Sequence, residues 1–242
     1  MAVMKRHDGR RANELRPMKI TTGYVRPADG SCLMELGETR VICTASFQES
    51  VPPWLAETGR GWVTAEYAML PASTGKRKRR PLGKPDGRSA EIQRLIGRVL
   101  RGVVAMDKLG ENTIYLDCDV LTADGGTRGA AITGAYVAVA EAVAKRRRQG
   151  GLGRGVLKGP VAAVSVGIVD GRPLLDLDYA EDAAAEVDMN VAMTRAGGFV
   201  EIQGTGEQAP FDGGQLQAML RLARSGVRKL VVAQMRAIRE MK

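Results

Sequence analysis

Residues that could hold an anion gather where a predicted strand runs into a predicted helix. An apolar, strand-like run over 112–121 leads into ADGGTRGAAITGAY (123–136), and helical spacing of alanines follows over 130–148. Glycines let backbone N–H groups approach an anion, a helix start adds positive dipole character, and Arg128 offers two parallel donors. An ordinary tight turn with a solvated arginine accounts for the same residues, so the junction alone leaves both interpretations open.

A second candidate site is a run of carboxylates. In DLDYAEDAAAEVDMN, six acidic residues fall within thirteen positions: Asp176, Asp178, Glu181, Asp182, Glu186 and Asp188. Clustered carboxylates supply hard oxygen ligands, which is how a partly hydrated Mg²⁺ is usually held. A polar turn with aspartate caps accounts for one or two of these residues but not easily for six. The run therefore favours a divalent metal site.

Between two predicted elements lies a strongly basic loop, PASTGKRKRRPLGKPDGR (71–88). Its cations carry no interleaved aromatic residues and are Lys76, Arg77, Lys78, Arg79, Arg80 and Lys84. Such a patch favours an electrostatic clamp on the phosphates of an RNA backbone. A solvated loop is the alternative.

Composition narrows the chemistry further. The chain has 36 Lys and Arg against 27 Asp and Glu, a net charge of +9 that favours polyanionic partners. Its only histidine, His7, lies in a charged N-terminal segment that we expect to be mobile. A Ser-His-Asp or paired-histidine mechanism needs a rigidly held histidine, so catalysis must rest on carboxylates, cations and metal. Together the three sites predict phosphoryl transfer on nucleic acid.

The cysteines and the apolar runs suggest the compartment. Cys32, Cys43 and Cys118 are odd in number and lie far apart in apolar contexts, which predicts buried free thiols in a reducing environment. No apolar run reaches the roughly 18 residues of a membrane span, and the charged N-terminus has no secretory h-region. We therefore expect a soluble, cytoplasmic protein with no membrane partner.

The periodicity predicts an α+β (α/β) fold built from two similar halves. In the first half, strands are expected over 18–25, 31–36, 40–47 and 61–70, followed by a helix over 89–106 and the strand and helix flanking the glycine junction. In the second half, strands are expected over 160–169, 172–179, 185–193 and 197–204. The C-terminal segment reads as two helices divided near Ser225 and Gly226.

Four motifs, in order and at consistent spacing, resemble the ribonuclease PH family of phosphate-dependent 3′→5′ exoribonucleases, also called tRNA nucleotidyltransferases. They are GRSAEIQRLIGRVLR (87–101), LDCDVLTADGGTRGAAITGA (116–135), LDLDYAEDAAAEVDMNV (175–191) and IQGTGEQAPF (202–211). The resemblance runs nearly end to end and implies one ribonuclease PH-type domain of two β-α halves over residues 1–242. It also implies a ring-shaped homohexamer made from three dimers.

The same resemblance implies roles for individual residues. Inorganic phosphate would be the co-substrate, bound by Arg88, Gly126, Thr127 and Arg128. The catalytic and metal-binding carboxylates would be Asp182 and Asp188, with Mg²⁺ the expected ion and Mn²⁺ the alternative. The implied reaction is reversible removal of nucleotides from RNA 3′ ends as nucleoside 5′-diphosphates, above all those beyond the CCA end of tRNA precursors.

Three other readings compete with this one. A non-catalytic ring subunit of the same superfamily should have lost Arg128, Asp182 or Asp188, and all three are present. A hydrolytic nuclease would use water, release monophosphates and need no arginine cradle. A polynucleotide phosphorylase carries two such domains with appended RNA-binding modules, for which 242 residues leave no room.

Overall fold

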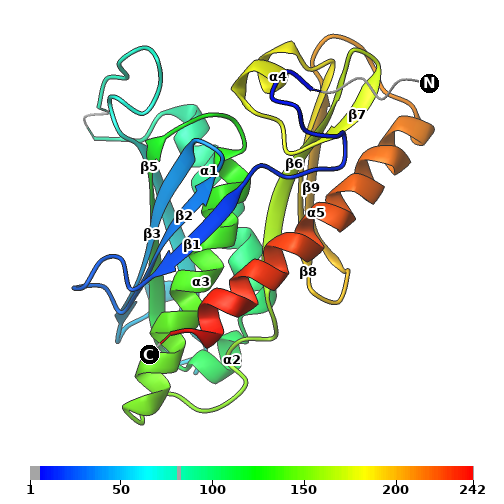
Figure 1. The fold of residues 1–242 in the computed structure, drawn as a ribbon. Coiled ribbons are helices and arrows are strands. Elements are labelled where there is room, and N and C mark those ends of the chain that lie inside the picture. The colour runs from blue at the N-terminus through cyan, green and yellow to red at the C-terminus, as the bar shows by residue number, and fades with distance from the viewer. Residues whose placement is uncertain (1–5, 81–82, 242) are drawn as a thin grey trace.

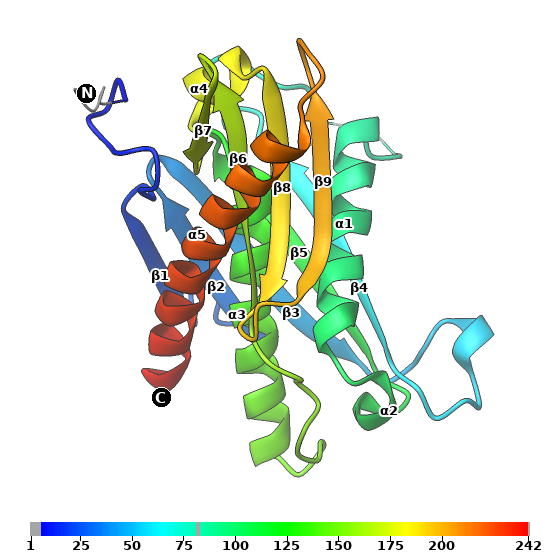
Figure 2. The same ribbon diagram turned by 90° about the vertical axis from the view of Figure 1, so that its right-hand side faces the viewer.

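The computed structural model describes residues 6–80 and 83–241. The protein has two β-sheets with helices packed against them, which confirms the predicted α+β class (Figures 1 and 2). The elements are, in chain order, β1 (Met18–Thr22), β2 (Gly30–Leu36), β3 (Thr39–Gln48), the 3₁₀ turn Pro53–Leu55, β4 (Trp62–Met69), α1 (Gly87–Val103), α2 (Met106–Leu109), β5 (Thr113–Thr122), α3 (Thr127–Arg148), β6 (Val161–Val169), β7 (Arg172–Leu175), α4 (Tyr179–Ala184), β8 (Val187–Thr194), β9 (Phe199–Gly206) and α5 (Gly213–Arg239).

The first sheet has the strand order β1-β2-β3-β5-β4, and the second has the order β7-β6-β8-β9. All neighbouring strands are antiparallel except β4 and β5, which run parallel. Helix α3 lies between the sheets and contacts β2, β3 and β6 (Figure 1), and one hydrophobic cluster extends from the first sheet through α3 into the second. The parallel pair ends at the start of α3, so β4, β5 and the helix N-terminus meet at one edge.

Helix α3 packs unusually close to the first sheet at Gly30. A Cβ placed there would lie 2.1 Å from the Ala138 carbonyl oxygen and 2.5 Å from the Ala142 nitrogen, both backbone atoms of α3. Backbone cannot move aside as a side-chain end can, so we expect Gly30→Ala to lower the free energy of unfolding by about 3 kcal/mol or more. Denaturant unfolding measures this. Gly213→Ala is the control, because open space surrounds that position and its stability should change by less than about 1 kcal/mol. Equal stability of the two variants would contradict the close packing.

The predicted division of the C-terminal segment is wrong. Helix α5 runs unbroken through Ser225 and Gly226. A Cβ on Gly226 would lie 2.7 Å from Leu175 Cδ1 of β7, which is fully buried. The glycine therefore allows close packing of α5 on the second sheet, and it does not end the helix.

The three cysteines are buried and free, as predicted. They occupy paired positions on adjacent strands, since Cys32 faces Cys43 and Cys43 faces Cys118. Burial raises the pKa of the Cys32 thiol above its usual range, which keeps it protonated and unreactive. Within 6–80 and 83–241, no helix combines the length and the apolar character that crossing a bilayer requires.

Candidate functional site

Two hollows of about 610 and 780 Å³ adjoin each other at the edge where α1, α3, α4 and β8 meet. Five residues line both of them: Arg88, Arg128, Asp182, Asp188 and Asn190. The structure therefore brings together the arginines and the two carboxylates that the sequence singled out. Gly126 and Thr127 line the larger hollow beside them.

The glycine junction has the backbone geometry that an anion cradle needs. Gly125 and Gly126 have φ values of 71° and 66°, a left-handed conformation that favours glycine. A Cβ on Gly125 would lie 2.6 Å from the carbonyl carbon of Asp178, so the junction packs directly against the segment that leads into α4. This contact brings Asp182 to the start of α3. The helix begins at Thr127, three residues earlier than predicted.

Two side chains hold the carbonyl groups of this junction. Thr39 donates a hydrogen bond to the Gly125 carbonyl at 2.7 Å, and the Arg16 guanidinium binds the Asp124 carbonyl. These bonds hold the carbonyl groups of the junction in position. The N–H groups of the first turn of α3 have no acceptor within the helix, which makes them suitable donors to an anion. Neither Arg16 nor Thr39 was predicted, since each is far from the junction in sequence.

Arg128 is oriented by a neighbour on α1. Its Nη2 donates to Glu91 Oε2 at 3.0 Å, and Gln203 Nε2 donates to Glu91 Oε1 at 2.7 Å. Burial opposes ionisation of Glu91, but these two hydrogen bonds lower its pKa below the usual value. Glu91 also follows Arg88 by three positions, which places the two on one face of α1. That spacing is the signal by which the sequence could have indicated Glu91.

Asp182 and Asp188 form a half-buried carboxylate pair. Burial raises the pKa of Asp182, while Arg88 and Arg128 oppose the shift. Burial and then the charge of Asp182 raise the pKa of Asp188 to about 6. Asp188 Oδ1 is buried without a hydrogen-bond partner among the described residues. Two repelling carboxylates with an unpartnered oxygen suit a divalent cation, so the donor set fits Mg²⁺ or Mn²⁺.

The other four acidic residues of the run have protein partners that account for them. Asp176, Asp178 and Glu181 are buried. Asp176 Oδ1 accepts from Arg16 Nη2 at 2.7 Å, and Glu181 forms an ion pair with Arg6. Asp178 caps α4 by accepting from the Glu181 backbone N–H at 3.1 Å, and Glu186 accepts from the Gly171 N–H at 2.8 Å. Helix capping and buried ion pairs thus explain most of the run.

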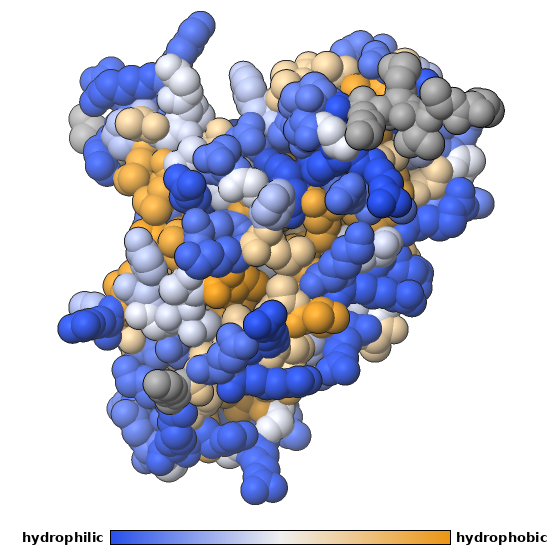
Figure 3. Space-filling view, in the orientation of Figure 1, coloured by the Kyte–Doolittle hydropathy of each residue, from blue (hydrophilic) through white to orange (hydrophobic). Residues whose placement is uncertain are grey.

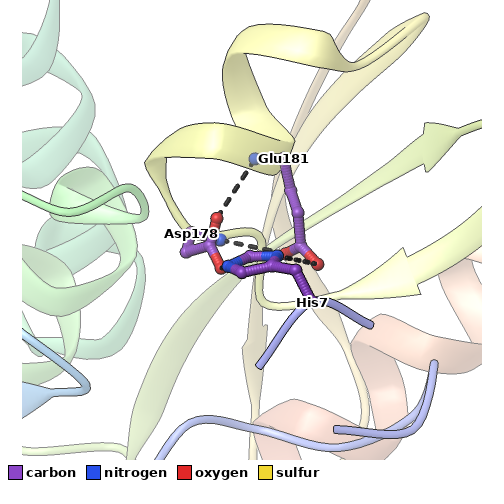
Figure 4. A group of neighbouring side chains, drawn as sticks. All are labelled: His7, Asp178 and Glu181. Carbon is purple, nitrogen blue, oxygen red and sulfur yellow. Dashed lines mark hydrogen bonds and ion pairs between the residues drawn. The ribbon is translucent and has the colours of Figure 1, made fainter. Parts of the chain in front are cut away.

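Residues 6–16 contact the rest of the protein, contrary to the mobility predicted for the N-terminal segment, and residues 1–5 lie outside the described residues. Arg6 and Arg10 are buried, and His7 Nε2 lies 3.1 Å from Asp178 Oδ2 (Figure 4). Potential ligand atoms of His7, Asp178 and Glu181 lie within 4.8 Å of one another. The same carboxylates already neutralise Arg6 and Arg10, so a cation there would face two buried positive charges. His7 lines neither hollow, in agreement with chemistry that uses no histidine.

The basic loop divides into two parts. Lys76 and Lys78 line the larger hollow together with Arg88. Arg77, Arg79 and Arg80 are exposed outside it. The region of the surface where this loop projects is largely hydrophilic (Figure 3). The loop therefore extends a positively charged surface from the cradle outward.

The two-sheet arrangement, with the glycine junction and the carboxylate pair at one edge, is that of a ribonuclease PH-type fold. Sequence models of the 3′ exoribonuclease family match residues 14–145 (domain 1) and 159–226 (domain 2). The chain therefore belongs to the ribonuclease PH family of 3′ exoribonucleases.

Solved structures share this fold at low sequence identity. Rice (Oryza sativa) Rrp46 is 17% identical with a TM-score of 0.80, and the match covers 97% of this chain and 100% of that one. A chain of the Archaeoglobus fulgidus exosome with RNA bound to the active site is 23% identical with a TM-score of 0.77, covering 93% and 91%. A chain of an archaeal exosome core is 21% identical with a TM-score of 0.74, covering 96% and 91%.

Proposed function

We propose that this protein is a phosphate-dependent 3′→5′ exoribonuclease that releases nucleoside 5′-diphosphates. The observation that carries the proposal is the meeting of the glycine junction, Arg88 and Arg128 with the pair Asp182 and Asp188 in one hollow. A hydrolytic nuclease needs the carboxylates but not the arginine cradle. A purely structural ring subunit needs neither.

Phosphate is the nucleophile in the proposed reaction. Arg88, Arg128 and the N-terminus of α3, with Gly126 and Thr127, hold hydrogen phosphate beside the last phosphodiester of the RNA. A phosphate oxygen bonds to the phosphorus of the terminal nucleotide, and the bond from that phosphorus to the preceding 3′ oxygen breaks. The proton of hydrogen phosphate ends on the leaving 3′ oxygen. A phosphoester is exchanged for a diphosphate, so the reaction runs in reverse when diphosphates are abundant.

Asp182 and Asp188 are the residues that would hold Mg²⁺, with Mn²⁺ as the alternative. When bound, the ion supplies positive charge that offsets the charge developing on the transferring phosphoryl group and the leaving oxygen. Both carboxylates line the same hollow as Arg128, which would put the ion beside the bound phosphate.

The proposed substrates are RNA 3′ ends, above all tRNA precursors with nucleotides beyond the CCA end. The basic loop supports an RNA partner, and the structurally similar Archaeoglobus fulgidus exosome binds RNA in its active site. We further propose a homohexamer built as a trimer of dimers, which light scattering tests, and a cytoplasmic location, which the buried free cysteines support.

The decisive experiment uses a tRNA with a short 3′ extension and Mg²⁺, with and without phosphate. Nucleoside diphosphates that appear only with phosphate are the expected result. Monophosphates, or release that does not depend on phosphate, would show hydrolysis instead. No release from any RNA would indicate a structural subunit.

Charge reversal of the basic loop is expected to weaken RNA binding and to flatten its salt dependence. Each phosphate contact contributes about 0.7–0.9 to the slope of log K against log salt, so reversing Lys76, Arg77, Lys78, Arg79 and Arg80 should reduce the slope by roughly two or more. Filter binding of tRNA between low and high salt measures this. Reversal of Arg147 and Arg148, exposed at the far end of α3, is the control. An unchanged slope in the loop variant would show that the loop is solvated and does not contact the RNA phosphates.

A further inference from the structure

Behind the cradle lies a tyrosine that touches no part of either hollow. Tyr67 is on β4, the residue is 2% exposed, and its hydroxyl lies 3.0 Å from Thr127 Oγ1. Thr127 is the first residue of α3 and lines the larger hollow. In the described part of the chain, Tyr67 is the one hydrogen-bond partner of the Thr127 hydroxyl.

The direction of this hydrogen bond follows from acidity and surroundings. A phenol is a stronger acid than an aliphatic alcohol, so Tyr67 donates and Thr127 accepts. Burial raises the pKa of the Tyr67 phenol, although the hydrogen bond with Thr127 and then the charges of Arg88 and Arg128 oppose the shift, and the phenol stays protonated. Once Thr127 Oγ1 accepts this proton, its own O–H is free to donate. Thr127 lines the larger hollow together with Arg88 and Arg128, so an anion held there is within the reach of its side chain.

We propose that Tyr67 is a positioning residue that commits the Thr127 hydroxyl to donate to the bound phosphate. This inference rests on the proposed function and deepens it. A hydrogen bond accepted by a hydroxyl also strengthens the one that it donates, so the pair acts as a short relay toward the anion. The location at the end of the parallel pair β4 and β5 gives the relay a rigid support, because Tyr67 pairs with Cys118 in the sheet.

The test compares Tyr67→Phe, Thr127→Val and the double variant in phosphate-dependent release of diphosphates. Tyr67→Phe keeps the ring and loses the donor, and we expect the KM for phosphate to rise about three- to tenfold with kcat and the Kd for RNA within twofold. In the Thr127→Val background, Tyr67→Phe should change the KM for phosphate by less than twofold, because the relay then has no second member. Thr127→Ser keeps the hydroxyl and should retain the full response to Tyr67→Phe.

Stability supplies a second, independent readout. Thr127→Val leaves the Tyr67 hydroxyl buried without a partner, so adding Tyr67→Phe should restore part of the lost Tm. Provided that wild-type release depends on phosphate, two results would overturn the relay. One is an equal rise in the KM for phosphate when Tyr67→Phe is made in wild type and in Thr127→Val, and the other is no rise in either. If wild-type release needs no phosphate, the proposed function itself fails, and the two failures are thereby distinguished.

Discussion

Replacement of Asp188 by asparagine is expected to lower kcat about a thousandfold while changing the Kd for RNA by less than about threefold. The variant keeps the volume of the side chain but removes one of the two charges that would hold the cation. It also replaces a buried, unpartnered carboxylate oxygen with a neutral amide. Single-turnover trimming of a 3′-extended tRNA over a range of Mg²⁺ concentrations measures the effect.

Asp170→Asn is a matched control for this substitution. Asp170 is exposed in the turn between β6 and β7, with a φ of 49° that asparagine tolerates well. We expect the control to keep wild-type kcat and Tm. If Asp188→Asn keeps more than a tenth of the wild-type kcat, Asp188 does not hold the ion and the carboxylate pair has another role.

Arg128→Ala should raise the KM for phosphate about a hundredfold, with a Kd for RNA within about threefold of wild type. The change removes a full positive charge and its donors from the start of α3, where the glycine junction can still supply backbone N–H groups. Initial rates at several phosphate concentrations, together with RNA filter binding, separate the two effects. The affinity for phosphate should fall far more than the affinity for RNA.

Arg148→Ala tests whether such a loss depends on position. Arg148 is the exposed last residue of α3, and Arg128 is the second residue of the same helix. Arg148→Ala therefore removes the same type of side chain at the opposite end of α3. Its KM for phosphate should match wild type. If Arg128→Ala instead weakens phosphate and RNA equally, the arginine contacts the RNA backbone and the phosphate cradle lies elsewhere.

Local patterns in the sequence predicted most of the fold because most of its elements are defined by local periodicity. The strand that ends at Thr122 and the helix that follows were both recognisable from apolar spacing. The unbroken α5 was not, because a glycine within a helix reads as a break until its packing partner Leu175 is known. Helix α4 was also missed, since it is only six residues long and its capping aspartate resembled a metal ligand.

The sequence was a poorer guide to the site than to the fold, because the site depends on contacts between residues far apart in the chain. Residue types alone cannot distinguish the proposed metal ligands Asp182 and Asp188 from the ion-paired Asp176 and Glu181, because all four are acidic residues in one run. What separates them is their partners, and Arg6 lies 175 positions from Glu181. Glu91 and Tyr67 were missed for a related reason, since each acts on a residue in another element.

The N-terminal arginines link completion of the site to segments that come much later in the chain. Arg16 binds the Asp124 carbonyl 108 positions later and Asp176 160 positions later. Closing loops of that length costs entropy before the contacts add stability, so we expect these bonds to form late in folding. On the ribosome, the first sheet is made well before β7 and α4 emerge. Under the proposed mechanism, a nascent or truncated chain that stops before Asp176 lacks a finished phosphate cradle and cannot degrade the RNA around it.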